Sequence, residues 1–221
     1  MLRYPRAMGS PAIPSAHSGR GRAERQLRII AGRWRGRRWR FPAAALRPTP
    51  DRVRETLFNW LQGRTEGAHC LDLYAGSGAL GLEALSRGAA SATFVEHEHA
   101  VAQALMRLLA DWQSSGAYVV RESARQFLRD ADAAAPRAAH AMRPARGFDL
   151  VFLDPPFASK ELAAVPALLA RGWLAPEARI YIEHARATPL PPLPADWREL
   201  RAGTAGEVGY HLFAPAGGAS A

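Results

Sequence analysis

Residues 69–88 read "HCLDLYAGSGALGLEALSRG", and this stretch decides the fold class. Positions 69–74 are mostly apolar, three glycines follow closely, and a second apolar run has helical spacing. This order predicts a buried strand over 69–74, a glycine-rich turn and a helix over 80–88. A strand that enters a helix through such a turn is typical of parallel sheets that bind a ligand beyond the strand ends.

The same alternation continues along the chain. The apolar patterns predict further strands over 91–96, 117–121, 148–154 and 178–184, and helices over 98–112, 123–131 and 159–171. Alternating strands and helices favour a doubly wound, mostly parallel α/β sheet. Residues 196–215 indicate a closing antiparallel hairpin with Gly203 and Gly206 in its turn, which brings the expected sheet to seven strands.

The segment before this sheet has a different character. "LRIIAGRWRGRRWRFP" (27–42) predicts two short strands around a turn at Gly36, with Trp39 and Phe41 on one face. The next helix should have Thr49 as its N-cap and Pro50 at its first position.

Charge is distributed very unevenly. Residues 1–54 hold 14 Arg and two acidic residues, whereas the remainder holds 15 basic and 18 acidic residues. The excess predicts an anionic partner at the N-terminal end. Cys70 is the single cysteine, which indicates a reducing compartment, and no apolar stretch is long enough for a transmembrane helix. We therefore expect a cytoplasmic protein without a membrane partner, an N-terminal transit peptide being the alternative to a disordered basic tail.

The glycine turn admits two ligand classes. Gly76, Gly78 and Gly81 form a G-x-G-x-x-G pattern, and Glu96 lies at the end of the next expected strand, as in dinucleotide sites. Asp72, four residues ahead of Gly76, is poorly placed beside a pyrophosphate. An acid there suits the ammonium and sulfonium groups of S-adenosylmethionine. Glu96 could then accept hydrogen bonds from the ribose hydroxyls of the same ligand. A turn that serves only the fold is a third interpretation.

The segment "FDLVFLDPPF" (148–157) ends a buried strand in an acid and two rigid residues. The Asp154 carboxylate and the Pro155 carbonyl can accept hydrogen bonds at one spot, and Phe157 offers a ring face. Such a site would hold a planar exocyclic amine and localise its lone pair toward a methyl donor. The alternative is a strand terminator made by Pro155 and Pro156 and capped by Asp154.

Arginines alternate with aromatic residues between positions 28 and 41. This mixture suits phosphates and unpaired bases of RNA, whereas aromatics packed on the sheet with solvated arginines are the alternative. The candidate RNA-binding residues are Arg28, Arg33, Arg35, Arg37, Arg38 and Arg52.

These stretches together with "LRPTPDRVRETLFNWL" (46–61) and "FVEHE" (94–98) resemble the RsmD family, bacterial methyltransferases that act on a guanine N2 of 16S rRNA. The resemblance implies a Rossmann-like class I methyltransferase fold, S-adenosylmethionine as cofactor and S-adenosylhomocysteine as product. It implies position 966 in 30S particles as the target. It also implies cofactor contacts at Asp72, Gly76, Gly78 and Glu96, and catalysis by Asp154, Pro155, Pro156 and Phe157.

One stretch departs from the family pattern. Where related enzymes carry a polar residue for the adenine amine, this chain has "RESARQFL" (121–128), so Glu122, Ser123 or the backbone N–H of Ala124 could serve. His97 and His99 are expected in a solvated turn, and we predict no metal site.

We expect a monomer with four parts: a disordered basic tail (1–24), a basic RNA-binding β-hairpin (25–48), the methyltransferase domain (49–213) and a tail (214–221). Residues 132–147 should form a flexible loop. Three other functions remain open from the residues alone: a DNA adenine-N6 or cytosine-N4 methyltransferase, a nicotinamide dehydrogenase, and a non-catalytic ribosome-assembly factor with the same fold.

Overall fold

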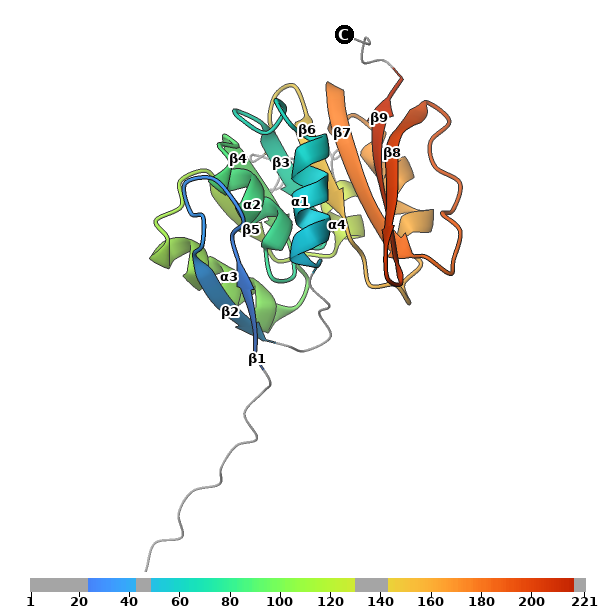
Figure 1. Cartoon of the computed structure of the whole chain (residues 1–221). Helices are drawn as coiled ribbons and strands as arrows, with labels where there is room; N and C mark the ends of the chain where they lie inside the picture. Colours follow the sequence, from blue (N-terminus) through green and yellow to red (C-terminus); the bar gives the residue numbers. More distant parts are fainter. Residues whose placement is uncertain (1–23, 43–48, 130–142, 217–221) are drawn as a thin grey trace, which may run out of the picture.

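A computed structural model describes residues 24–42, 49–129 and 143–216 of the chain (Figure 1). The expected N-terminal tail, most of the expected 132–147 loop and the last five residues lie outside the described residues. No helix within the described ranges is both long and apolar enough to cross a membrane.

The centre of the molecule is a seven-stranded sheet with the order β5-β4-β3-β6-β7-β9-β8. The first five strands in this order run parallel, and β9 is antiparallel to both of its neighbours. This confirms the predicted mixed sheet with a C-terminal antiparallel hairpin. The strands are β3 (His69–Asp72), β4 (Ser91–Val95), β5 (Ala117–Val120), β6 (Phe148–Leu153), β7 (Leu174–Ala185), β8 (Trp197–Ala205) and β9 (Val208–Pro215).

Each face of the sheet carries its own apolar core, because alternate strand residues point to opposite faces. One core holds Cys70 and Phe152 with the helices α1 (Asp51–Trp60), α2 (Ala79–Ser86) and α3 (His99–Asp111). The other holds Leu71 and Val151 with α4 (Ala124–Arg129) and α5 (Val165–Leu169). Both faces are therefore covered, as the near-continuous apolar strands require.

Two expectations about local structure in the C-terminal half of the chain were wrong. The helix expected over 159–171 is a short 3₁₀ turn, η3 (Glu161–Ala163), followed by the five-residue α5, because Pro166 starts a new helix rather than continuing one. Gly203 lies inside β8 opposite Tyr210, where a Cβ would come within 2.6 Å of the tyrosine ring. Of the two glycines expected in this turn, only Gly206 is there, with φ +59°.

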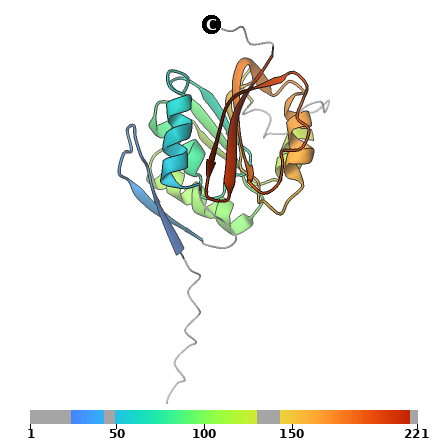
Figure 2. The same ribbon diagram turned by 45° about the vertical axis from the view of Figure 1, so that its right-hand side comes forward.

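The N-terminal hairpin consists of β1 (Glu24–Arg28) and β2 (Arg38–Pro42), paired antiparallel. Trp39 and Phe41 share a buried face, as predicted, and they join the core formed by α1, α2 and α3. Trp34 and Trp39 both contact Trp112 edge to face at the end of α3. Figure 2 shows the hairpin on the outside of the helical layer, and Figure 1 shows β8 on the other side of the molecule. Its aromatic rings are buried, so they support the fold and are not available to stack on bases.

Candidate functional site

One cavity of about 930 Å³ lies at the carboxyl ends of the parallel strands. It brings together the glycine loop after β3, the acid after β4 and the DPPF segment after β6, although these are far apart in the sequence. Since β3 and β6 are neighbours, Asp72 pairs in register with Phe152 and lies close to Asp154. The predicted residues that line it are Asp72, Gly76, Glu96, Ser123, Ala124, Asp154, Pro155, Pro156 and Phe157.

The glycine loop is built around Glu96. The Gly76 N–H donates to one oxygen of this carboxylate at 2.9 Å, and the Glu98 N–H donates to the other at 2.7 Å. The two bonds fix the orientation of a side chain that is 6% exposed and borders the cavity. The exposed His97 ring lies beside the same carboxylate, with Nδ1 3.2 Å from Glu96 Oε1.

Gly78 has a different place from the one its spacing suggested. It precedes α2 with φ +77°, and it is not among the residues that line the cavity. A Cβ at this position would come within 2.7 Å of Leu105 Cδ1 on α3. Its observed role is therefore to let α2 start close to α3, while the cofactor contact expected for it stays a prediction.

Asp72 is a buried acid at the end of β3. It is 3% exposed and accepts a hydrogen bond from the Gly81 N–H at 3.2 Å. Burial, with a smaller contribution from Glu96, raises the pKa of Asp72 to about 7, against the partial opposition of backbone hydrogen bonds. Among the described residues no cation pairs with it, so a positively charged ligand would favour its ionised form.

Asp154 shares a hydroxyl with a second carboxyl that the sequence did not indicate. Thr49 Oγ1 lies 3.2 Å from Asp154 Oδ2 and 2.9 Å from Glu183 Oε1. Burial, and then the nearby Glu183, raise the pKa of Asp154 well above its ordinary value. Burial likewise raises the pKa of Glu183, although Tyr181 and Thr49 oppose this by hydrogen bonding.

The predicted N-cap role of Thr49 was wrong. Pro50 occupies the N-cap position of α1 without a side-chain cap, and the Thr49 hydroxyl points to the two carboxyls instead. Two acceptors in a buried site are stronger partners for the hydroxyl than a helix end whose first N–H groups can reach water. Thr49 thus belongs to the cavity rather than to the helix start.

The remaining DPPF residues form part of the cavity wall. Pro155 is buried, whereas Phe157 keeps 40% of its surface exposed, which is unusual for so large an apolar side chain. A partly exposed ring therefore lies next to the half-buried Asp154, and the roles expected for the two side chains, stacking surface and amine acceptor, stay predictions.

The 121–128 segment also borders the cavity. Ser123 forms a local turn in which its hydroxyl donates to Gln126 Oε1 at 2.9 Å, and Ala124 begins α4. Arg125, which belongs to this segment, pairs with Glu161 at 2.9 Å, and the Tyr74 hydroxyl donates to the same carboxylate at 3.0 Å. Glu122, Ser123 and Ala124 are all within the lining, so the adenine contact stays open among them.

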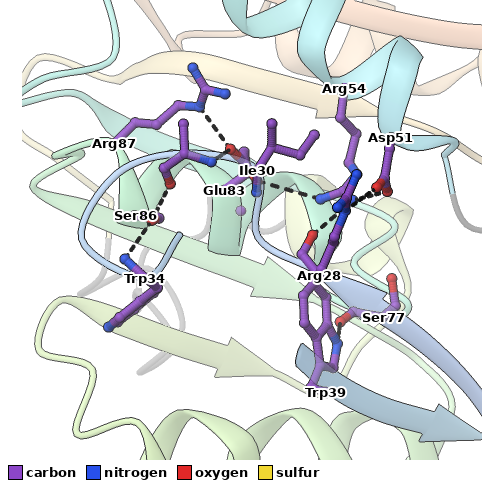
Figure 3. A network of polar contacts seen from close by, with 12 residues as sticks. Arg28, Ile30, Trp34, Trp39, Asp51, Arg54, Ser77, Glu83, Ser86 and Arg87 are labelled. Carbon is purple, nitrogen blue, oxygen red and sulfur yellow. Dashed lines mark hydrogen bonds and ion pairs between the residues drawn. The ribbon is translucent and has the colours of Figure 1, made fainter. Parts of the chain in front are cut away.

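A buried polar network fastens the N-terminal hairpin to α2 (Figure 3). The Glu83 carboxylate accepts hydrogen bonds from the Ile30 N–H at 2.9 Å and from the Ala31 N–H at 3.0 Å. It also pairs with Arg87 at 2.8 Å and lies 3.5 Å from the buried Arg54. Sequence reasoning missed this network, although a charged residue on the apolar face of each of two helices was a signal for it.

The same hairpin contacts the glycine loop. Trp39 Nε1 donates to the Ser77 carbonyl at 2.9 Å, within the loop that borders the cavity. The Trp34 N–H donates to Ser86 Oγ at 3.0 Å, which holds the turn between β1 and β2 against the end of α2. The hairpin and the cavity are therefore mechanically connected.

The candidate RNA-binding arginines lie on the outside of the hairpin and of α1. Arg28 pairs with Asp51 at 2.7 Å, and Arg33 and Arg37 lie over the rings of Trp34 and Trp112. The guanidinium groups of these three residues are thereby oriented by the fold. Arg35, Arg38 and Arg52 are exposed.

Comparison with known proteins gives a consistent result. The family model described as "Conserved hypothetical protein 95" matches residues 27–214. The chain is 47% identical to the ribosomal RNA small subunit methyltransferase D of Escherichia coli over 199 residues, which is 89% of this chain and 92% of that protein. It is 42% identical to the protein of the same name from Haemophilus influenzae, over 86% of this chain and 95% of the relative.

Solved structures agree with this match. A putative methyltransferase from Escherichia coli superposes with a TM-score of 0.74 at 46% identity, covering 86% of this chain and 98% of the other. A putative methylase from Haemophilus influenzae gives a TM-score of 0.67 at 42% identity, over 85% and 97% of the two chains. With the family model matching most of its length, this chain belongs to the RsmD family of methyltransferases, the family described as conserved hypothetical protein 95.

Proposed function

We propose that this enzyme transfers a methyl group from S-adenosylmethionine to the exocyclic N2 of a guanine in the 16S rRNA of the small ribosomal subunit, at position 966. We further propose that it acts as a monomer on 30S particles in the cytoplasm. The observation that carries the proposal is the single cavity shared by the glycine loop and the DPPF segment. The names of the relatives, small-subunit ribosomal RNA methyltransferases, support the choice of substrate.

The residues on the β3 and β4 side of the cavity fit the cofactor. Asp72 is buried with a raised pKa and lacks a cation among the described residues, so the ammonium or the sulfonium would supply the missing charge. Glu96 is held in place by two backbone N–H groups and can accept ribose hydroxyls. When bound, S-adenosylmethionine supplies an electrophilic methyl group. A cavity that serves only the fold would need neither an unpaired buried acid nor a carboxylate placed to bind ribose.

The residues on the β6 side fit the amine. Asp154 and the Pro155 carbonyl accept the two N–H groups of the exocyclic nitrogen, which pulls it toward tetrahedral geometry and localises its lone pair. Phe157 provides a partly exposed ring against which the base can stack. Orientation of the base at this corner supplies a large part of the rate acceleration.

The substrate base must leave its stack to enter the cavity. The N2 of a guanine that is stacked and paired in an RNA helix cannot reach residues inside the cavity. The target must therefore be an unpaired or flipped nucleotide. The exposed arginines of the hairpin and α1 would contact the flanking phosphates.

The decisive experiment is methyl transfer to 30S particles that lack the modification, followed by mass mapping of the methylated nucleosides in 16S rRNA. We expect one N2-methylguanine per particle, at position 966. Methylated adenine or cytosine in DNA would instead favour the alternative amine methyltransferase, and binding of the particle without transfer would favour an assembly factor.

A further inference from the structure

The carboxyl groups of the cavity fall into two sets. Asp72 and Glu96 follow β3 and β4, on the side that fits the cofactor. Asp154 follows β6, and Glu183 lies on β7, the next strand away from β3. The order of the strands therefore places Glu183 beside the amine-holding corner.

Glu183 is a buried carboxyl in the wall of the cavity, and two hydroxyl groups hold one of its oxygens. It is 2% exposed and still belongs to the lining of the cavity. Its Oε1 atom accepts hydrogen bonds from Thr49 at 2.9 Å and from Tyr181 at 2.8 Å. Within the described part of the chain, neither a cation nor a third donor contacts this carboxyl. A buried acid with this environment is expensive to ionise unless a ligand brings a donor to its second oxygen.

The chemistry of guanine supplies that donor. Its pairing edge presents the N1–H next to the N2 amine, so two adjacent donors enter together. Thr49 Oγ1 lies within hydrogen-bond distance of both Asp154 and Glu183, which puts the two carboxyls side by side. Adenine and cytosine present a ring nitrogen lone pair beside their amine, and this lone pair would face a carboxylate.

We infer that Glu183 binds the N1–H of the target guanine while Asp154 and Pro155 hold N2, and that Thr49 keeps the two carboxyls in register. The inference rests on the proposed function and adds to it the residue that selects guanine among bases with an exocyclic amine. A flipped base is read on its pairing edge in this way by other base-modifying enzymes.

The test compares guanine with 2-aminopurine at the target position of 30S particles assembled with synthetic rRNA segments. The analogue keeps the C2 amine, but it lacks the C6 oxygen and has a lone pair at N1 in place of the N1–H. The Glu183→Gln variant described below responds to the change at N1. We expect the wild-type enzyme to methylate the analogue with a kcat/KM lower by roughly 100-fold, because a buried acceptor would be left facing a second acceptor. Binding of both particles in the presence of S-adenosylhomocysteine, where transfer cannot occur, should show the same preference.

Glu183→Gln identifies the residue responsible. A glutamine amide can donate to the N1 lone pair, so the guanine to 2-aminopurine ratio should fall by roughly 10-fold or more, in transfer and in binding. Glu199→Gln, on β8 and outside the cavity lining, is the matched control and should leave the ratio unchanged. Thermal unfolding and S-adenosylhomocysteine affinity report whether the variant keeps its fold.

The outcomes separate this inference from the proposed function. Equal transfer to guanine and 2-aminopurine by the wild-type enzyme would overturn the role of N1, and this arm needs no variant. An unchanged ratio in Glu183→Gln would overturn the assignment to Glu183. Absence of transfer to guanine at any position would overturn the proposed function and the inference together.

Discussion

Single residues set the chemistry of the cavity through burial. Asp72, Asp154 and Glu183 are carboxyls that face one space, and burial raises the pKa of each. Burial removes the interactions of a carboxylate with water, and a bound ligand can replace them. Carboxyl groups with raised pKa values therefore gather at functional sites. The cavity is thus electrostatically complementary to a cation together with a donor-rich base.

Asp154 is expected to be essential for transfer and dispensable for cofactor binding. Asp154→Ala removes an acceptor of the amine, so single-turnover transfer should fall by at least roughly 100-fold. Affinity for S-adenosylmethionine, measured calorimetrically, should stay within a few-fold. Asp111→Ala, at the end of α3 outside the cavity lining, is the control. Near wild-type transfer by Asp154→Ala would show that the amine is held elsewhere.

Asp72 should make cofactor affinity depend on pH. Its pKa of about 7 in the protein without a ligand exceeds the ordinary value of 3.8, so it is largely protonated below neutrality. A cationic ligand binds the ionised form, so affinity should be full above about pH 8 and should fall by up to tenfold per pH unit below 7. Calorimetry between pH 5.5 and 8.5 measures this. Asp72→Asn should bind weakly with a flat profile, and a flat profile in the wild type would contradict the assignment.

At the scale of elements, the hairpin formed by β1 and β2 is fixed by close backbone approach. Gly32 has φ +83°, and a Cβ there would come within 1.9 Å of the Ser86 carbonyl oxygen. Gly36 has nearly the same φ, +80°, with nothing within 4 Å of its Cβ position. A side chain at Gly36 would meet only backbone strain, whereas a side chain at Gly32 would meet the same strain and a steric clash with Ser86. Comparison of the two positions therefore distinguishes the two effects.

Replacement of each glycine by alanine tests this docking. Gly36→Ala should cost about 1 kcal/mol of unfolding free energy, the penalty of the left-handed conformation. Gly32→Ala should cost at least about 2 kcal/mol more, since the end of α2 must move away. Denaturant unfolding measures both. Equal losses in the two variants would show that the contact with Ser86 is not maintained in solution.

Glu83 should stabilise the hairpin through its buried network. Glu83→Ala would leave the Ile30 and Ala31 N–H groups without their acceptor and would remove one of the two carboxylates that pair with the buried Arg54, the other being Asp51. We expect a loss of about 3 kcal/mol of unfolding free energy. Glu55→Ala, on the exposed face of α1, should change stability by no more than about 0.5 kcal/mol. Denaturant unfolding followed by tryptophan fluorescence suits this test, because Trp34 and Trp39 report on the hairpin. A loss below about 1 kcal/mol at Glu83 would contradict the role given to the network.

At the scale of the whole molecule, the hairpin formed by β1 and β2 carries positive charge on one face and packs on the protein through its apolar face. Its aromatic residues face the helical layer, while its arginines lie on the surface. Figure 1 places this basic end on the opposite side of the molecule from the β8 edge of the sheet. The hairpin also touches the glycine loop through Trp39 and Ser77, so docking of RNA on it would orient the particle relative to the cavity.

Removal of charge at this end should change the salt dependence of RNA binding. When an arginine that neutralises a phosphate is replaced by alanine, the slope of log affinity against log salt becomes shallower by about 0.7–0.9. The triple change of Arg35, Arg38 and Arg52 to Ala should therefore flatten the slope by about 2 to 3. Arg171, Arg198 and Arg201, exposed elsewhere on the surface, provide the matched triple control. The same slope in both triple variants would favour a merely solvated arginine surface.

Several features of the site could be predicted because their signals are local. The glycine turn after 69–74, the acid at Glu96 and the DPPF segment each follow an apolar strand, and parallel strands place their carboxyl ends at one edge. Asp72 and Asp154 could therefore be expected in one cavity before any coordinates. The hairpin aromatics were predicted on one face for the same local reason, but which surface they cover was not.

The sequence by itself determined the alternation of strands and helices, the position of the glycine loop and the chemistry at the strand ends, since periodicity and turn residues act over a few positions. Only the tertiary structure decided that Thr49 bridges Asp154 and Glu183, residues 105 and 134 positions away, and that Arg54 and Glu83 hold the hairpin. Those partners meet because of strand order and helix packing. A buried polar group takes whichever partner the fold brings within reach, and no local pattern names that partner.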